Sequence, residues 1–262
     1  MNRLKIGIRL ESLGLPLRKA LQQASRLGVG GVQVDAVGDL SPTRLSETGR
    51  REFRHMLRAY NLELTALGCP LRRGLDVAED QQPRLEHVRK VMSLGYDLGP
   101  RVVIVQAGQV PEDVNSERGA RLSESLTALA QHGDRIGVTL ALETGLESGA
   151  VLRAFLDRFD SGSLGVNFDP ANLLLHGFDV YESVRALHGK IVHAHAKDAR
   201  ASSASRAAQE VPLGHGDIDW IEYLAVLEEV DYCGWITIER EVSDNRLADA
   251  AAAVAFLRRF VG

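Results

Sequence analysis

The regular alternation of strand-like and helix-like segments is the feature that most constrains this chain. Eight short apolar runs each precede a segment with helical spacing, and 262 residues divided among eight pairs give about 33 residues per pair. No linker-like composition separates two halves. This length and rhythm are typical of a (β/α)8 TIM barrel, an α/β fold whose active sites lie at the C-terminal ends of its strands. We therefore expect one barrel domain over residues 1–262.

The expected segments alternate without interruption until a polar stretch at residues 199–216. The expected strands are 4–9, 32–36, 62–67, 102–106, 138–143, 164–169, 190–198 and 234–239, and the expected helices are 16–27, 47–60, 83–98, 117–136, 149–159, 180–187, 219–229 and 246–260. A doubly wound open sheet is the alternative fold. We disfavour it because the segment after the first strand, Arg9-Leu-Glu-Ser-Leu-Gly14, lacks a glycine-rich phosphate motif.

Four successive strands in the C-terminal half carry ligand-type side chains at or near their ends. Three apolar runs close on Glu143, Asp169 and Glu239, and the fourth carries His195. An ionised carboxylate at the end of a buried strand is costly unless it is paired or bound to a metal. Because the ends of parallel strands meet at one edge, we expect these four groups to form an oxygen-rich set with one imidazole. Such a set suits a divalent ion.

Composition excludes several other classes of protein. The net charge of −4 and the interspersed basic residues give no basic face for nucleic acid, so no nucleic-acid partner is expected. Cys69 and Cys233 are too few and too far apart for a disulfide framework, which fits a reducing compartment. No apolar run approaches the ~20 residues of a membrane span. We expect a soluble, cytoplasmic protein with no membrane association.

Five motifs carry a resemblance to a known family. They are Ala141-Leu-Glu143-Thr144, Asn167-Phe-Asp169-Pro-Ala-Asn172, His193-Ala-His195-Ala-Lys197-Asp198, Pro212-Leu-Gly214-His-Gly216-Asp-Ile-Asp-Trp220 and Ile238-Glu239. With these motifs the sequence resembles the xylose isomerase-like barrel superfamily, in particular its sugar isomerase and epimerase branch. The resemblance implies that Glu143, Asp169, His195 and Glu239 bind one divalent metal ion, and that the two glutamates also carry protons. Manganese, magnesium, cobalt and zinc are all compatible with this set.

The sequence also departs from the pattern of the family that it resembles at informative positions. Several epimerases of the family have a substrate-contacting histidine three residues after the metal-binding aspartate, where this chain has Asn172. The related apurinic-site endonucleases use extra histidines after strands 3 and 4 to build a three-metal cluster. Here the corresponding positions hold Cys69 and Gln106, so a multi-metal phosphodiester site is not expected.

A second group of polar residues is predicted to contact substrate or to support the site. The candidate substrate-binding residues are Asn172, Lys197, Asp198, Gln106 and Arg200. Lys197 and Asp198 either form an ion pair that orients the site or are solvated. His193 is expected to support or pack, and Arg9 and Asp35 either line the pocket or pair structurally. Residues 199–216, with Arg200 and Arg206, form either a lid or a surface loop.

These residues favour a metal-dependent isomerase or epimerase of a small keto-sugar or hydroxy-carbonyl compound. The reaction would pass through a metal-bound enediolate, with Glu143 and Glu239 as base and acid. Two bases on two faces imply epimerisation, whereas one base serving both carbons implies 1,2-isomerisation. A dehydratase of a cyclic polyol-ketone and a non-catalytic sugar-binding barrel are the alternatives. The expected partners are a small carbohydrate-type substrate and, in a homo-oligomer, further copies of the chain as a dimer or tetramer.

Overall fold

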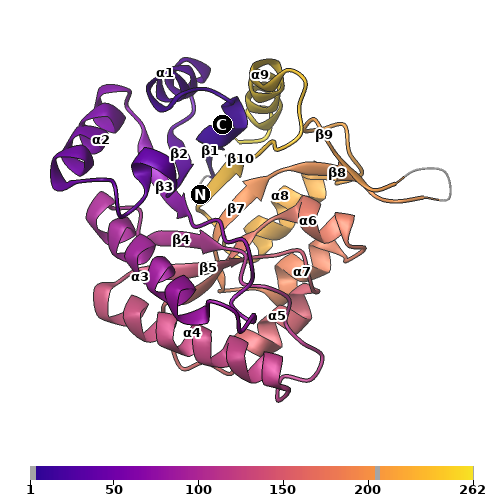
Figure 1. The fold of residues 1–262 in the computed structure, drawn as a ribbon. Coiled ribbons are helices and arrows are strands. Elements are labelled where there is room, and N and C mark those ends of the chain that lie inside the picture. The colour runs from indigo at the N-terminus through magenta and orange to yellow at the C-terminus, as the bar shows by residue number, and fades with distance from the viewer. Residues whose placement is uncertain (1–3, 204–206, 262) are drawn as a thin grey trace.

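A closed barrel of parallel strands forms the centre of the molecule (Figure 1). The computed structural model describes residues 4–203 and 207–261. Around the barrel the order is β1 (Lys5–Arg9), β10 (Trp235–Ile238), β7 (Ile191–Ala196), β6 (Leu164–Phe168), β5 (Thr139–Glu143), β4 (Val102–Val105), β3 (Glu63–Gly68) and β2 (Gly31–Asp35). The described residues therefore confirm the predicted (β/α)8 TIM barrel.

Helices surround the barrel on its outside, as Figure 1 shows. They are α1 (Leu17–Leu27), α2 (Glu47–Ala59), α3 (Gln81–Leu98), α4 (Glu117–Ile136), α5 (Gly149–Leu156), α6 (Pro170–Leu175), α7 (Val180–Ala186), α8 (Trp220–Glu229) and α9 (Arg246–Leu257), with short 3-10 turns at Leu10–Leu13 and Gly38–Leu40. Serine side chains at 46, 116 and 148 accept a hydrogen bond from the first turn of α2, α4 and α5. These caps fix where the helices begin.

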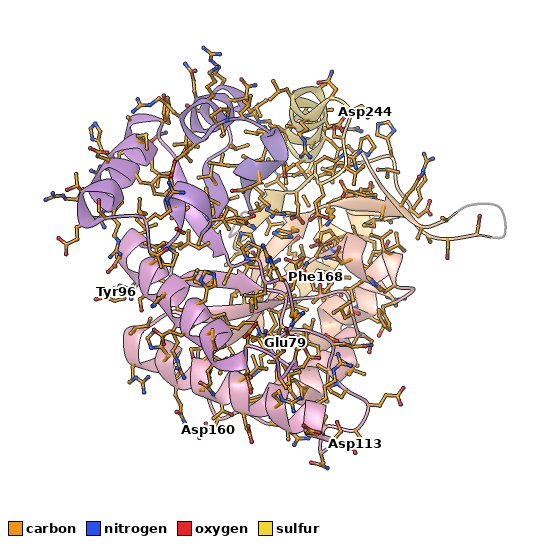
Figure 2. The ribbon with its side chains drawn as sticks, in the orientation of Figure 1. Glu79, Tyr96, Asp113, Asp160, Phe168 and Asp244 are labelled. Carbon is orange, nitrogen blue, oxygen red and sulfur yellow. The ribbon has the colours of Figure 1, made fainter. Side chains whose placement is uncertain are left out.

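Apolar residues fill the space between the strands and the helices. Phe168 is fully buried and stacks on Tyr223 of α8 with a ring separation of 5.9 Å. In Figure 2 the side chains of Tyr96, Asp160 and Asp244 lie at the periphery, whereas Phe168 lies inside the fold. No helix in the described part of the chain is long and apolar enough to cross a membrane.

The described residues of the polar stretch 199–216 include strand structure that the sequence analysis did not predict. The stretch contributes to a two-stranded antiparallel hairpin, β8 (Asp198–Arg200) and β9 (Gln209–Val211), while the expected strand 190–198 ends at Ala196. Asp198 organises this segment, because its carboxylate accepts hydrogen bonds from the backbone N–H groups of Ala199, Gly214 and Gly216 and from the Trp220 indole. Arg206 lies outside the described residues.

The register of the barrel brings the ends of β5, β6, β7 and β10 to one level. Glu143 pairs with Asn167, Asn167 pairs with His193, and Thr237 pairs with His195. Side chains from residues up to about 100 positions apart in the sequence therefore meet at the same height in the barrel. This arrangement positions the candidate site.

Candidate metal centre and active site

Three of the predicted ligands form a compact group that can hold a metal ion. One ligand atom from each of Glu143, Asp169 and His195 lies within 4.8 Å of the other two. Glu143 is the last residue of β5, and His195 belongs to β7. Asp169 follows β6 and caps α6, because its Oδ1 accepts the backbone N–H of Asn172 at 2.9 Å. Its Oδ2 remains directed at His195 Nδ1, 3.5 Å away.

Glu239, the fourth predicted ligand, lies beside this group. Its Oε2 is 3.0 Å from His195 Nδ1, and its Oε1 forms an ion pair with Arg9. The Oε2 atom is buried, and a second cation, Lys197 Nζ, lies 3.5 Å from it. A buried carboxylate oxygen is stabilised by a cation. The donor set of three carboxylates and one imidazole fits a divalent ion, with Glu239 as a predicted ligand.

Gln33 determines which nitrogen of His195 faces the carboxylates. The Gln33 side chain on β2 is buried, and its Oε1 lies 2.9 Å from His195 Nε2. An amide oxygen only accepts, so Nε2 carries a proton and Nδ1 faces Asp169 and Glu239. Gln33 was not among the site residues predicted from the sequence. Its signal was a polar side chain between Val32 and Val34 in an otherwise apolar run.

The two candidate acid–base glutamates have different electrostatic surroundings. Burial, and then the charges of Glu239 and Asp169, raise the pKa of Glu143 to about 7. Burial would also raise the pKa of Glu239, but the positive charges of His195, Lys197 and Arg9 hold it well below its usual range. Of the two, Glu143 is therefore the group whose ionisation is closest to neutral pH.

Both histidines of β7 are buried, but their charges differ. Burial lowers the pKa of His195, yet the charge of Glu239 and hydrogen bonds to Asp169 and Glu239 raise it overall to about 10. Burial, and then the charge of His195, hold the pKa of His193 well below its usual range. His193 is therefore neutral near pH 7, whereas the metal-free His195 is an imidazolium among carboxylates.

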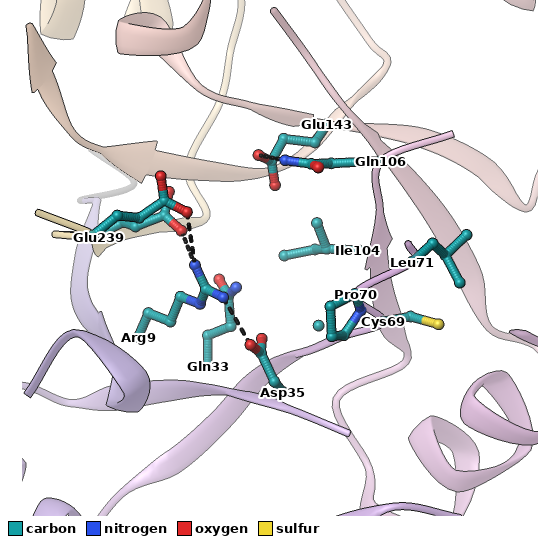
Figure 3. Close-up of a pocket in the computed structure, with 12 residues that line it drawn as sticks. Arg9, Gln33, Asp35, Cys69, Pro70, Leu71, Ile104, Gln106, Glu143 and Glu239 are labelled. Atoms are coloured by element: carbon teal, nitrogen blue, oxygen red, sulfur yellow. Dashed lines mark hydrogen bonds and ion pairs between the residues drawn. The ribbon is translucent and has the colours of Figure 1, made fainter. Parts of the chain in front are cut away.

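A cavity of about 160 Å³ opens over the centre (Figure 3). Its wall includes Glu143, Glu239 and the β4 end residue Gln106, together with Arg9, Gln33, Asp35, Gly68, Cys69, Pro70, Leu71, Ile104 and Glu241. Arg9 bridges two carboxylates in Figure 3, Glu239 and Asp35, and its Nη2 lies 2.7 Å from Asp35 Oδ2. Drug-sized ligands fill about 300–1,000 Å³, so this cavity suits a compound with few heavy atoms.

Three of the weaker candidates surround the centre. The side-chain amides of Gln106 and Asn172 donate to Glu143 Oε1 at 3.1 Å and 3.0 Å. Lys197 is buried and lies 3.5 Å from Glu239, 3.7 Å from Asp169 and 2.8 Å from Glu241. Lys197 therefore pairs with the carboxylates of the centre.

The remaining two candidates are engaged elsewhere. Asp198 faces the loop amides described above, so the ion pair that we considered between Lys197 and Asp198 is not present. Arg200 Nε donates to the backbone oxygen of His215 at 2.9 Å. Neither residue lines the cavity. Their predicted contacts with substrate stay predictions.

Comparisons with known proteins place the chain in a family. A family profile described as "Xylose isomerase-like TIM barrel" matches residues 21–260. An uncharacterised protein of Methanocaldococcus jannaschii is 25% identical over 190 residues, and L-ribulose-5-phosphate 3-epimerase UlaE of Escherichia coli is 28% identical over 182 residues. Both alignments cover 68% of this chain, and the chain spans only 62% of the length of these relatives.

Solved structures show the same fold along almost the whole chain. A xylose isomerase domain protein from Planctomyces limnophilus superposes with a TM-score of 0.88 at 27% identity, covering 98% of this chain and 97% of that one. A D-psicose 3-epimerase superposes with a TM-score of 0.79 at 17% identity, covering 98% and 99%. The second likeness concerns the fold alone. From the profile match across nearly all of the barrel, the chain belongs to the xylose isomerase-like TIM barrel family.

Proposed function

We propose that the protein is a divalent-metal-dependent epimerase or isomerase of a small ketose or hydroxy-carbonyl compound. One observation carries the proposal: Glu143 and Glu239 line the same small cavity. They come from the ends of β5 and β10, which are separated by two strands in the barrel. The compact group of candidate metal ligands lies at the same place. Two carboxylates on different sides of one substrate can remove and return a proton. The L-ribulose-5-phosphate 3-epimerases among the relatives favour a ketose substrate.

The residues that would hold the ion are Glu143, Asp169, His195 and Glu239. Manganese, magnesium, cobalt and zinc all accept oxygen and imidazole donors of this kind. A bound ion would supply a positive charge that stabilises the negative charge developing on the substrate oxygens. The compact group that Glu143, Asp169 and His195 form is the observation that best fits this role.

The side chains around Glu143 and Glu239 prepare them for proton transfer. Gln106 and Asn172 donate to Oε1 of Glu143, so its carboxylate is held within the wall of the cavity. Arg9 binds Oε1 of Glu239 and leaves Oε2 directed toward the centre. In the proposed reaction one glutamate removes the proton next to the carbonyl, and the other returns a proton from the opposite face. This assignment favours epimerisation over 1,2-isomerisation.

A substrate screen in deuterated water tests the proposal. The Mn²⁺-loaded protein is incubated with D-fructose, D-psicose, D-tagatose, L-ribulose and L-ribulose 5-phosphate, and products are followed by NMR. We expect one ketose to give its C3 epimer with deuterium at that carbon. Deuterium at C2 of an aldose product would identify a 1,2-isomerase, and loss of water would identify a dehydratase. Saturable sugar binding without any exchange would instead support a non-catalytic barrel.

A further inference from the structure

We propose that His193 is a positioning residue that fixes Glu143 through a directional hydrogen-bond chain, Thr237 to His193 to Asn167 to Glu143. The four residues come from β10, β7, β6 and β5, and the first three are buried in the barrel interior. The inference rests on the proposed function only for the role of Glu143 as base. The direction of the chain is independent of any substrate.

The orientation of the Asn167 amide follows from its contacts with Glu143 and His193. Its Nδ2 also lies 3.3 and 3.4 Å from the two ring nitrogens of His195, but those nitrogens face Gln33 and Glu239. Asn167 Nδ2 lies 3.3 Å from Glu143 Oε2, and Asn167 Oδ1 lies 2.8 Å from His193 Nδ1. An ionised carboxylate only accepts hydrogen bonds, so the NH₂ group must face Glu143 and the carbonyl oxygen must face His193. An amide oxygen also only accepts. His193 Nδ1 therefore carries the proton of the neutral ring.

The other nitrogen of His193 faces two threonine hydroxyls. Its Nε2 lies 3.0 Å from Thr237 Oγ1 and 3.3 Å from Thr65 Oγ1. The Thr65 hydroxyl donates to the backbone oxygen of Val32 at 3.2 Å, so its hydrogen is already used. Thr237 is then the donor to Nε2, and every hydrogen bond points toward Glu143.

This hydrogen-bond chain ends at Oε2 of Glu143. The side-chain amides of Gln106 and Asn172 reach Oε1, whereas Asn167 holds Oε2 from a fully buried position. Asn167 is in turn held by His193, so loss of the imidazole would release the amide to rotate. Residues that hydrogen-bond to a metal ligand commonly contribute about 10–100-fold to metal affinity. The two histidines on one face of β7 therefore have separate tasks, His195 as ligand and His193 as support.

NMR of the metal-free, ¹⁵N-histidine-labelled protein tests the direction of the chain. Two-bond proton–nitrogen correlations distinguish the ring tautomers, and His193→Asn identifies the signal. We expect His193 in the Nδ1–H tautomer. An Nε2–H tautomer would require the Asn167 amide to be reversed, and it would overturn the proposal.

Mn²⁺ titration of matched variants tests the consequence. His193→Asn keeps an N–H donor at the place of Nδ1 and should bind within a few-fold of the parent, whereas His193→Leu should bind about 10–100-fold more weakly. Thr237→Val removes the donor to Nε2 and should weaken binding more than Thr65→Val, which removes a hydroxyl at the same ring nitrogen. Equal effects of the two threonine variants, or parent-like Mn²⁺ binding by a folded His193→Leu, would contradict the proposal.

A variant that does not fold, and a protein that turns over no tested substrate, can both be distinguished from these outcomes. Circular dichroism and melting show whether His193→Leu folds, and if it does not, the two threonine variants decide the result. The tautomer and the Mn²⁺ affinity are measured without substrate. An inactive protein with the expected tautomer and affinities would therefore overturn the proposed function while it supports the positioning role of His193.

Discussion

Arg9 on β1 and Glu239 after β10 form an ion pair across neighbouring strands at the wall of the cavity. The guanidinium also binds Asp35. Burial alone would lower the pKa of Arg9, but the charges of Glu239 and Asp35 hold it above its usual range. One oxygen of Glu239 is thereby occupied and the other is turned toward His195. Arg9 thus orients the Glu239 carboxylate, which we propose both binds the metal ion and transfers a proton.

Replacing Arg9 should destabilise the protein. Arg9→Met leaves Glu239 and Asp35 without their shared partner, and removing one member of a buried pair costs about 3–5 kcal/mol. Because the Arg9 side chain is 19% exposed, we expect a loss of about 3 kcal/mol in urea unfolding, the lower end of that range. Arg18→Met, on the exposed side of α1, is the matched control and should change little. Equal unfolding free energies for both variants would refute this role of Arg9.

Metal loss should be separable from loss of the α6 cap. Asp169→Asn keeps an oxygen that can accept the Asn172 N–H, and asparagine caps helices as well as aspartate does. We expect this variant to melt near the metal-free parent and to bind Mn²⁺ far more weakly, by elemental analysis after dialysis. Asp179→Asn at the start of α7, capped in the same way, is the control and should retain metal. An Asp169→Asn protein with full metal content would remove Asp169 from the ligand set.

Stability of the metal-free protein should fall as pH rises. The folded pKa values of Glu143 and His195 are raised, from 4.5 to about 7 and from 6.5 to about 10. A group whose pKa is higher in the folded than in the unfolded protein stabilises the fold at pH values below its unfolded pKa. This stabilisation is lost as the pH rises through the pKa of the folded protein. Stability should therefore be lost over about pH 4.5–7 through Glu143 and over about pH 6.5–10 through His195.

A bound divalent ion should remove this dependence, because ligands bind in their deprotonated forms. The Tm difference between Mn²⁺-loaded and chelator-treated protein should widen from pH 6.5 upward, in the window of His195. His195→Ala controls for other groups that titrate at high pH, and it should show no such widening. A constant Tm difference across this window would contradict the assigned protonation of His195.

The sequence was sufficient to predict the fold and the convergence of Glu143, Asp169 and His195. Strands of a parallel barrel all end at one face, so residues at strand ends, such as Glu143 and Asp169, meet without any knowledge of packing. The short helix α6 was missed, although Asp169 and Pro170 are a cap and a first-turn proline. The β8–β9 hairpin was missed because three-residue strands carry no readable alternation.

Interactions across the barrel could not be predicted in the same way. Gln33 reaches His195 over a separation of 162 residues, and Arg9 reaches Glu239 over 230. These partners depend on side-chain rotamers and on the stagger of the strands, which the order of the segments does not specify. Asp198 adjoins the centre in sequence, but its carboxylate points into the loop that it organises, and this direction could not be predicted from the sequence either.

Solvent-deuterium exchange into each epimer separately tests the central claim, that Glu143 and Glu239 are proton carriers on two faces of one substrate. Each Mn²⁺-loaded variant, Glu143→Gln and Glu239→Gln, is incubated in deuterated water with one pure epimer of the identified ketose, and metal content is measured in parallel. We expect epimerisation to fall by about 10²–10⁴-fold in both variants. Each variant should still exchange deuterium into one epimer, and the two variants should differ in which epimer exchanges. A variant that keeps its metal and still interconverts the epimers within a few-fold of the parent would contradict the account.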